Sequence, residues 1–284
     1  MYKKGYNTCF TGKRILLIFI PVFIFLFYSS LSANENYPLG SRAAAMGNAA
    51  VAFSDIWAVH HNQAGLAGLS SLQAGFHHEN RFLEKEFGLQ ALAVALPARP
   101  GTIALNYTYF GFSHYNESKL GLAFGRMFGE RIAAGIQINY LHTYIAGIYG
   151  ETGNLTAEGG FIAQPVRGLF IAAHVYNPTG TKIKTYYDEP VPTVLKLGLA
   201  GYLGQRVLVS VETEKDLNHK AVFKAGAEMG VLGSLFLRMG IKSDPVQSSF
   251  GIGYIFGRLA ADLAFTNHQR LGLTPHFTAC YAFR

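Results

Sequence analysis

The amino-acid sequence predicts an all-β protein: a transmembrane antiparallel β-barrel of about 14 strands with a plug-like N-terminal segment. From Leu72 onward, segments of about ten residues alternate between apolar side chains and small or charged ones, as strands between lipid and a lumen do. Short turns and longer loops separate these segments. Hydrophobic residues make up 50% of the chain and charged residues only 14%. No apolar run beyond the N-terminus reaches the roughly 20 residues that a membrane helix needs.

The first 33 residues predict a cleaved export signal. A basic region comes first, an apolar run follows at 15–28, and small residues lead to Ala33. The run is about 14 residues long and contains Pro21, which argues against the alternative of an uncleaved membrane anchor. The basic region holds Lys3, Lys4, Lys13 and Arg14. Without these four, 20 basic residues face 17 acidic ones, a surplus too small to predict nucleic-acid binding.

Residues 34–71 do not alternate as strands do, and we expect them to pack inside the barrel or against its periplasmic mouth. Residues 72–284 form the predicted barrel. Its strands are expected at 72–79, 86–96, 101–112, 118–128, 131–145, 154–164, 167–176, 193–203, 206–214, 220–231, 233–242, 248–256, 258–266 and 273–283. The segment at 87–96 is apolar on both faces and is the least regular of them.

The connections between the predicted strands alternate strictly between short and long. Short turns are expected at 97–101, 129–130, 165–168, 204–205, 232–233 and 257, and longer loops at 79–85, 113–117, 146–153, 177–192, 215–219, 243–247 and 267–272. Barrels of the outer membrane have short periplasmic turns and long external loops. The pattern therefore predicts the outer membrane of a Gram-negative bacterium, with both termini in the periplasm.

Several charged residues fall on the inward face of the predicted strands. They are Lys196, Lys224, Glu228, Arg238 and Asp262, together with Glu158, Glu212 and Lys242. Charges in a lumen need partners or water. They either form ladders of salt bridges that fill a closed barrel or line an aqueous or amphipathic path.

No metal, cofactor or catalytic site is predicted. His60 and His61, like His77 and His78, are adjacent, and neighbouring strand residues point to opposite faces, so each pair offers at most one ligand to a site. We interpret all four as polar side chains that are exposed to water. The carboxylates of Glu212 and Glu214 lie near the external end and are interpreted as solvated rim charges. No nucleophile motif is present, so an enzyme is not expected.

The N-terminal segment resembles the PorV/PorQ proteins, which are relatives of the FadL-type outer-membrane transporters. The matching residues are Gly40, Arg42, Ala43, Ala45, Met46, Gly47, Asp55, Asn62, Ala64, Gly65 and Leu66. Gln63 departs from the family, where proline is usual, and His60 and His61 replace an aromatic pair. The resemblance returns at 191–198, at 224–228 and at 237–240, and it implies a fourteen-strand barrel plugged or lined by its N-terminal segment.

The resemblance implies a binding or scaffold component of type IX protein secretion or surface display. Its partners would be outer-membrane lipid and secretion-system proteins or secreted cargo domains. The alternative is a FadL-like uptake channel for a hydrophobic ligand. The two differ in the lumen, because a channel needs a cavity for lipid or detergent and a scaffold does not.

Overall fold

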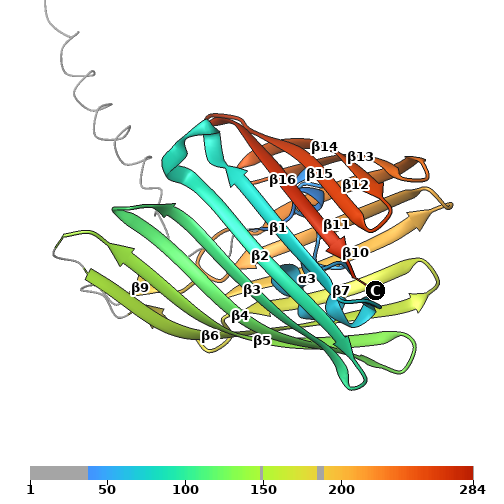
Figure 1. The fold of residues 1–284 in the computed structure, drawn as a ribbon, viewed down its shortest axis with the longest axis horizontal. Helices are drawn as coiled ribbons and strands as arrows, with labels where there is room; N and C mark the ends of the chain where they lie inside the picture. Colours follow the sequence, from blue (N-terminus) through green and yellow to red (C-terminus); the bar gives the residue numbers. More distant parts are fainter. Residues whose placement is uncertain (1–37, 148–149, 184–188, 284) are drawn as a thin grey trace, which may run out of the picture. The chain divides into compact units, whose positions relative to one another are not determined.

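The computed structural model describes residues 38–147, 150–183 and 189–283. In this part of the chain, 14 strands close into one antiparallel barrel (Figure 1). Each strand pairs with its neighbours along the chain, and the first, β1, pairs with the last, β16. The predicted fold class is confirmed. The predicted export signal at 1–33 lies outside the described residues.

The barrel strands agree closely with the predicted ones. They are β1 Gln73–Asn80, β2 Gly88–Ala98, β3 Gly101–Phe112, β4 Tyr115–Phe128, β5 Ile132–Ile145, β6 Gly150–Val166, β7 Leu169–Tyr176, β10 Val194–Leu203, β11 Val207–Asp216, β12 Val222–Leu232, β13 Leu235–Ser243, β14 Val246–Phe256, β15 Leu259–His268 and β16 Gly272–Ala282. Between β7 and β10, the short strands β8 Lys182–Ile183 and β9 Glu189–Pro190 pair with each other.

The predicted alternation of short and long connections is wrong at three places. Strands β3 and β4 are joined by residues 113–114 alone, β13 and β14 by 244–245 alone, and β15 and β16 by 269–271, which is no longer than the turn at 129–131. At the first two places pairing continues to the end of the hairpin, with Phe112 opposite Tyr115 and Ser243 opposite Val246. The strand ends at 116–117 and 247–249 are polar, which in a sequence is typical of loops. We call the barrel end that carries 81–87 and 177–193 the long-loop end, and the other the short-turn end.

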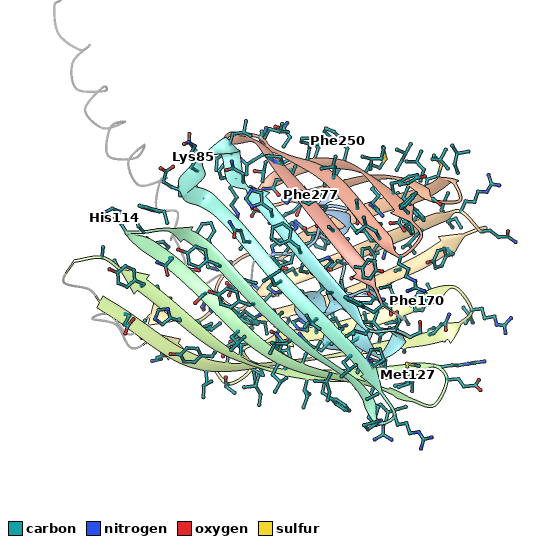
Figure 2. The ribbon with its side chains drawn as sticks, in the orientation of Figure 1. Lys85, His114, Met127, Phe170, Phe250 and Phe277 are labelled. Carbon is teal, nitrogen blue, oxygen red and sulfur yellow. The ribbon has the colours of Figure 1, made fainter. Side chains whose placement is uncertain are left out.

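The outer face of the barrel is apolar. Leu197, Met239 and Ile136 are each more than 60% exposed, and Phe250 and Phe277 stand on the same face (Figure 2). Such a surface on a closed barrel is suited to lipid rather than water. No helix in the described part of the chain is long and apolar enough to cross a membrane.

Residues 38–71, which we call the inner segment, lie inside the barrel. They contain the short helices α2 Ser41–Ala45, α3 Ala58–His61 and η2 Gln63–Gly68, and the side chains of Met46, Ala58 and Leu66 are fully buried. Two more turns, η3 Arg81–Leu83 and η4 Lys85–Phe87, join β1 to β2. The inner segment explains why the segment at 87–96 is apolar on both faces. Its inward residues, including Leu89 and Ala93, pack against Trp57 and Leu66 instead of water.

Candidate functional site

The inner segment follows a track of glycines on the inner face of the wall. A Cβ atom added at Gly226 or Gly240 would meet the backbone of Met46 or Gly47, and one added at Gly135 would meet that of Gln63. Further glycines along the track are Gly125, Gly160, Gly198 and Gly251. Glycine permits such close approach of two backbones. The small residues predicted on the inner face of the strands therefore leave the space that the inner segment occupies.

Wall hydroxyl groups satisfy the backbone at both ends of helix α2. Ser41 N donates to Thr278 Oγ1 at 2.8 Å, and Gly47 N donates to Ser249 Oγ at 3.0 Å. Ser249 Oγ in turn donates to Ala45 O at 3.0 Å. Helix ends leave amide and carbonyl groups without intrahelical partners, and burial without a partner is costly. These contacts fix the helix to β14 and β16.

Arg42 joins helix α2 to the wall by a bidentate ion pair. Its Nε and Nη2 atoms each lie 2.8 Å from a Glu228 carboxylate oxygen, and Nη1 lies 3.2 Å from Asp55 Oδ2. Arg238 Nε donates to Glu228 at 2.6 Å and its Nη1 donates to Asp262 at 2.5 Å. Predicted residues from the N-terminal motif and from the lumen therefore meet in one chain of charges. Fork-to-fork pairing of this kind fixes orientation as well as charge.

Glu212 holds the middle of the inner segment. Its Oε2 accepts from the backbone N–H groups of Ala50 and Val51, both at 2.9 Å, while Oε1 accepts from Lys224 Nζ at 2.8 Å. Lys224 also donates to Glu214 at 2.7 Å. The interpretation of Glu212 as a solvated rim charge is wrong, since this side chain is buried by the inner segment.

The remaining motif residues shape the inner segment itself. Asn62 Nδ2 donates to Val51 O at 2.8 Å, and its Oδ1 caps η2 by accepting from Ala64 N at 3.2 Å. Gly40 has a φ of +89° under the Trp57 ring, and a Cβ at Gly65 would meet Phe53 O. Five of the eight predicted motif residues contact the wall: Arg42, Met46, Gly47, Asn62 and Leu66. The other three, Gly40, Asp55 and Gly65, contact residues of the inner segment itself.

A second polar cluster lies toward the long-loop end of the lumen. The Glu158 carboxylate lies 2.9 Å from Lys119 Nζ and accepts from Gln137 and Asn139, also at 2.9 Å. His174 Nε2 lies 3.1 Å from its other oxygen. Lys196 has a looser contact, 3.6 Å from Glu214. Within the described residues, this geometry favours salt-bridge ladders over an open aqueous path.

His60 and His61 are buried on helix α3, so the expectation of wetted side chains on a strand is wrong for both. Burial, together with nearby Lys119, holds the pKa of His60 well below its usual range. Burial, together with Lys196, lowers the pKa of His61 to about 4. The Nε2 atom of His61 lies 2.7 Å from Leu39 O. Both imidazoles are therefore neutral at pH 7.

Acidification is expected to weaken the fold through His61. Its folded pKa of about 4 lies below the unfolded value, so the unfolded chain binds the proton first and stability falls as pH drops through this window. Between pH 7 and pH 5 the loss is about 2 kcal/mol. Urea unfolding of wild type and of His61→Gln at both pH values measures it. The pH-dependent loss should shrink in His61→Gln and persist in His78→Gln; an unchanged loss in His61→Gln contradicts the assignment.

Two hollows accompany the inner segment and the wall. One of about 250 Å³ lies at the short-turn end, between Arg42 and Phe53 of the inner segment and Arg131 and Tyr202 of the wall. The other, of about 1110 Å³, runs along β7 and β10 to β15. Most of its lining side chains, such as Leu197, Phe223 and Ile241, belong to the outward face. We call this second one the wall hollow.

No protein-family model matches the chain. No curated protein matches it either. Among solved structures, the Ralstonia pickettii toluene transporter TbuX matches with a TM-score of 0.68 and 11% identity over 86% of this chain and 98% of that one. The P. putida toluene transporter TodX gives 0.64 and 10% over 86% and 98%. A Pseudomonas aeruginosa FadL homologue gives 0.63 and 10% over 87% and 99%. The chain has the fold of these FadL-like 14-stranded barrels.

Proposed function

We propose that the protein is an outer-membrane channel for small hydrophobic molecules, with the inner segment closing the lumen. The observation that carries this proposal is the likeness to structures described as toluene transporters, which extends over 86% of the chain and includes the closed 14-stranded barrel. The apolar outer face supports a place in a membrane, and the export signal predicted at 1–33 supports the outer one. By the positions of the longest connections, both termini would face the periplasm.

The ion pairs of the lumen are a poor surface for an apolar ligand, because stripping charges of their partners is costly. The wall hollow offers the apolar alternative, with Leu197, Leu199 and Phe223 among its lining residues. Apolar side chains with few polar groups are usual in small-molecule sites. We infer that the hydrophobic molecule first binds there.

Uptake of labelled toluene tests this function with a matched pair of variants on β13. Ile241 and Met239 are both outward-facing and nearly equally exposed, at 63% and 65%, but only Ile241 lines the wall hollow. We expect Ile241→Gln to slow uptake about tenfold, since an amide that a bound apolar molecule covers and leaves without a partner weakens binding by about 1.4 kcal/mol. Met239→Gln should transport as wild type does. Equal uptake by cells with and without the gene would exclude the channel.

The second candidate is a PorV/PorQ-like scaffold in type IX secretion or surface display. It is favoured by the same lumen: around Glu158, Glu212 and Glu228, the described side chains form ion pairs and hydrogen bonds with one another. A closed barrel of this kind would act through its long-loop end. Comparison of surface and secreted proteins in a deletion strain decides, because a scaffold predicts loss of cargo from the surface with toluene uptake unchanged.

A further inference from the structure

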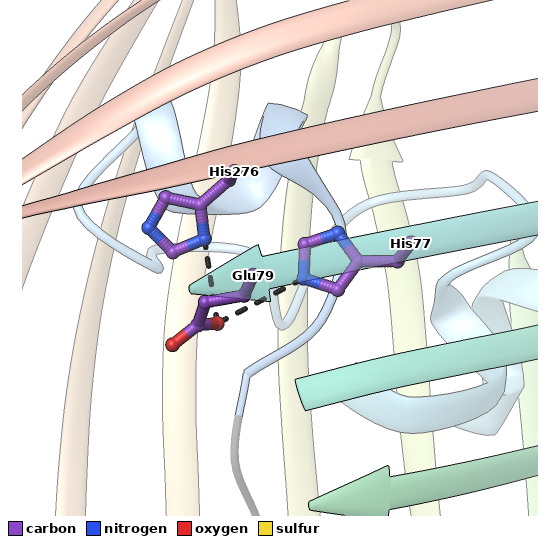
Figure 3. Close-up of side chains that lie close together, drawn as sticks. All are labelled: His77, Glu79 and His276. Atoms are coloured by element: carbon purple, nitrogen blue, oxygen red, sulfur yellow. Dashed lines mark ion pairs between the residues drawn. The ribbon is translucent and has the colours of Figure 1, made fainter. Parts of the chain in front are cut away.

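The closure of the barrel brings two histidines and a glutamate together at its seam, the pair formed by β1 and β16. His77 and Glu79 lie on β1, and His276 lies on β16 directly opposite Glu79. All three side chains point inward and converge (Figure 3). They are buried, with exposures of 0%, 5% and 7%. The expectation of a water-exposed His77 is wrong, and the sequence does not single out His276, which lies 199 residues after His77.

The three potential ligand atoms already have nearly the spacing of a metal site. Glu79 Oε2 lies 3.3 Å from His276 Nδ1 and 3.8 Å from His77 Nε2, and all three atoms lie within 4.8 Å of one another. Zinc lies about 2.0–2.2 Å from nitrogen and oxygen ligands, so tetrahedral geometry separates neighbouring ligand atoms by roughly 3.3 Å. The Glu79 to His276 side of the triangle already has this length, and the Glu79 to His77 side, at 3.8 Å, has to shorten by about half an ångström. The two imidazole nitrogens lie within 4.8 Å of each other.

The other nitrogen of each imidazole is held by a threonine hydroxyl. His77 Nδ1 lies 2.9 Å from Thr278 Oγ1, and His276 Nε2 lies 3.0 Å from Thr266 Oγ1. In contrast, His77 Nε2 and His276 Nδ1, which face Glu79, have no hydrogen-bond partner among the described residues. Histidines that bind metals usually have this arrangement, with the outer nitrogen hydrogen-bonded and the inner one directed at the ion.

The contacts of the Thr278 hydroxyl are compatible with the His77 tautomer that a metal ligand needs, in which Nδ1 carries the proton. Ser41 N donates to Thr278 Oγ1 at 2.8 Å, and Ser41 Oγ lies within hydrogen-bond distance of the same oxygen, also at 2.8 Å. A hydroxyl offers one donor and two lone pairs. In this tautomer Thr278 donates its hydroxyl proton to Ser41 Oγ, accepts from Ser41 N–H with one lone pair and accepts from His77 Nδ1–H with the other. The Nε2 lone pair of His77 is then directed at Glu79.

The charge around the cluster indicates which ions fit. Arg81 Nε donates to Glu79 Oε1 at 2.6 Å, so Arg81 occupies one carboxylate oxygen and leaves Oε2 to the imidazoles. A site with two imidazoles and a single shared carboxylate suits late first-row ions such as Zn²⁺ or Cu²⁺. Mg²⁺ and Ca²⁺ prefer oxygen ligands and are not expected to bind.

We propose that His77, Glu79 and His276 form a site for one late first-row divalent metal ion, which ties the first strand of the barrel to the last. Three protein ligands leave a fourth position open to water. Because the ion binds the folded barrel and not the unfolded chain, it stabilises the folded barrel by mass action. The ion therefore holds the two strands of the seam together. This assignment is independent of the proposed channel function.

Zinc titration of the full-length protein in detergent tests the site directly by calorimetry. Two exposed pairs, His142–Glu151 and His219–Asp216, could also bind zinc, and the titration therefore uses a His142→Ala/His219→Ala background. In this background the heat of zinc binding reports on the seam. We expect one zinc ion per barrel in this background. His77→Ala and His276→Gln should each weaken binding at least about 100-fold, and Thr266→Val about 10-fold to 100-fold. His78→Ala, whose side chain lies on the outward face of β1, should bind as the background does.

Cobalt and thermal unfolding give a second readout. Co²⁺ should develop visible absorption in the background protein and in His78→Ala but not in His276→Gln, and zinc should raise the unfolding temperature of the same two proteins only. Slower migration after heating in detergent gels shows that each variant has a folded barrel. No binding up to about 1 mM zinc, or binding that survives both His77→Ala and His276→Gln, would overturn the site.

Discussion

Gly226→Ala is expected to displace the inner segment from the wall. The added Cβ would lie against the backbone oxygen, the Cα and the Cβ of Met46, a residue that is fully buried and fixed on both sides. Overpacking of this kind costs about 1–3 kcal/mol, and contact with backbone rather than with a flexible side chain places the cost near the upper end. The loss should appear as release of helix α2 rather than as loss of the barrel.

Limited trypsin digestion measures this release, because cleavage after Arg42 yields a fragment that begins at Ala43. A cost of about 3 kcal/mol raises the open population, and with it the cleavage rate, about 100-fold. Gly230→Ala is the matched control, since Gly230 lies on the same strand and a Cβ there meets nothing closer than 3.7 Å. Gly240→Ala should repeat the effect of Gly226→Ala. Equal protection of all three variants would show that the track does not hold the segment.

Glu228→Gln is expected to have an effect of similar size. The substitution keeps the shape of the side chain but removes the charge that Arg42 and Arg238 share, leaving each guanidinium with one other carboxylate, Asp55 or Asp262. Removal of one partner from a buried ion pair costs about 3–5 kcal/mol, and since the Arg42 side chain is 23% exposed, we expect about 3 kcal/mol.

A double-mutant cycle with Arg42→Met assigns this loss, measured by urea unfolding in detergent. If the Arg42 to Glu228 contact carries the energy, the double variant should be more stable than the sum of the two single losses predicts. Glu84→Gln, which removes an exposed carboxylate, controls for the change in net charge. Strict additivity of the two losses would assign the effect of Glu228→Gln to Arg238 instead.

The fold could be predicted from the sequence because each strand carries its own signal. Two-residue alternation is a local pattern that can be recognised in each strand separately. It is strong here because one face of each strand meets lipid and the other meets a crowded lumen, as at Lys196 between Leu195 and Leu197. The same signal is missing where polar residues follow one another, as at 116–117 and 247–249, and the sequence therefore predicts loops that are too long at 113–117 and 243–247. At Leu89 and Ala93, the inner face is apolar because it meets the inner segment, a contact that no local pattern records.

Single residues of the candidate sites could be predicted from the sequence, but not which of them contact one another. Arg42 and Glu228 were both singled out, yet 186 residues separate them, and their meeting depends on which wall strand lies beside helix α2. The burial of His60 and His61 follows from helix α3 lying inside a closed barrel. His276 could have been placed opposite Glu79 by assuming that the first and last strands pair, and the inward phase of each strand would then have aligned them.

The pairing of β1 with β16 also has a consequence for the order of assembly. Every other contact between barrel strands is made with a neighbour along the chain, whereas Gln73 meets Ala282 only when the final strand is present. The inner segment leaves the ribosome before all of the strands that enclose it, and its bonds from Gly47 to Ser249 and from Ser41 to Thr278 span most of the sequence. Contacts so distant along the chain form late, since the entropy of loop closure opposes them. The wall therefore assembles around a segment that precedes it, and joining of the two edge strands encloses that segment.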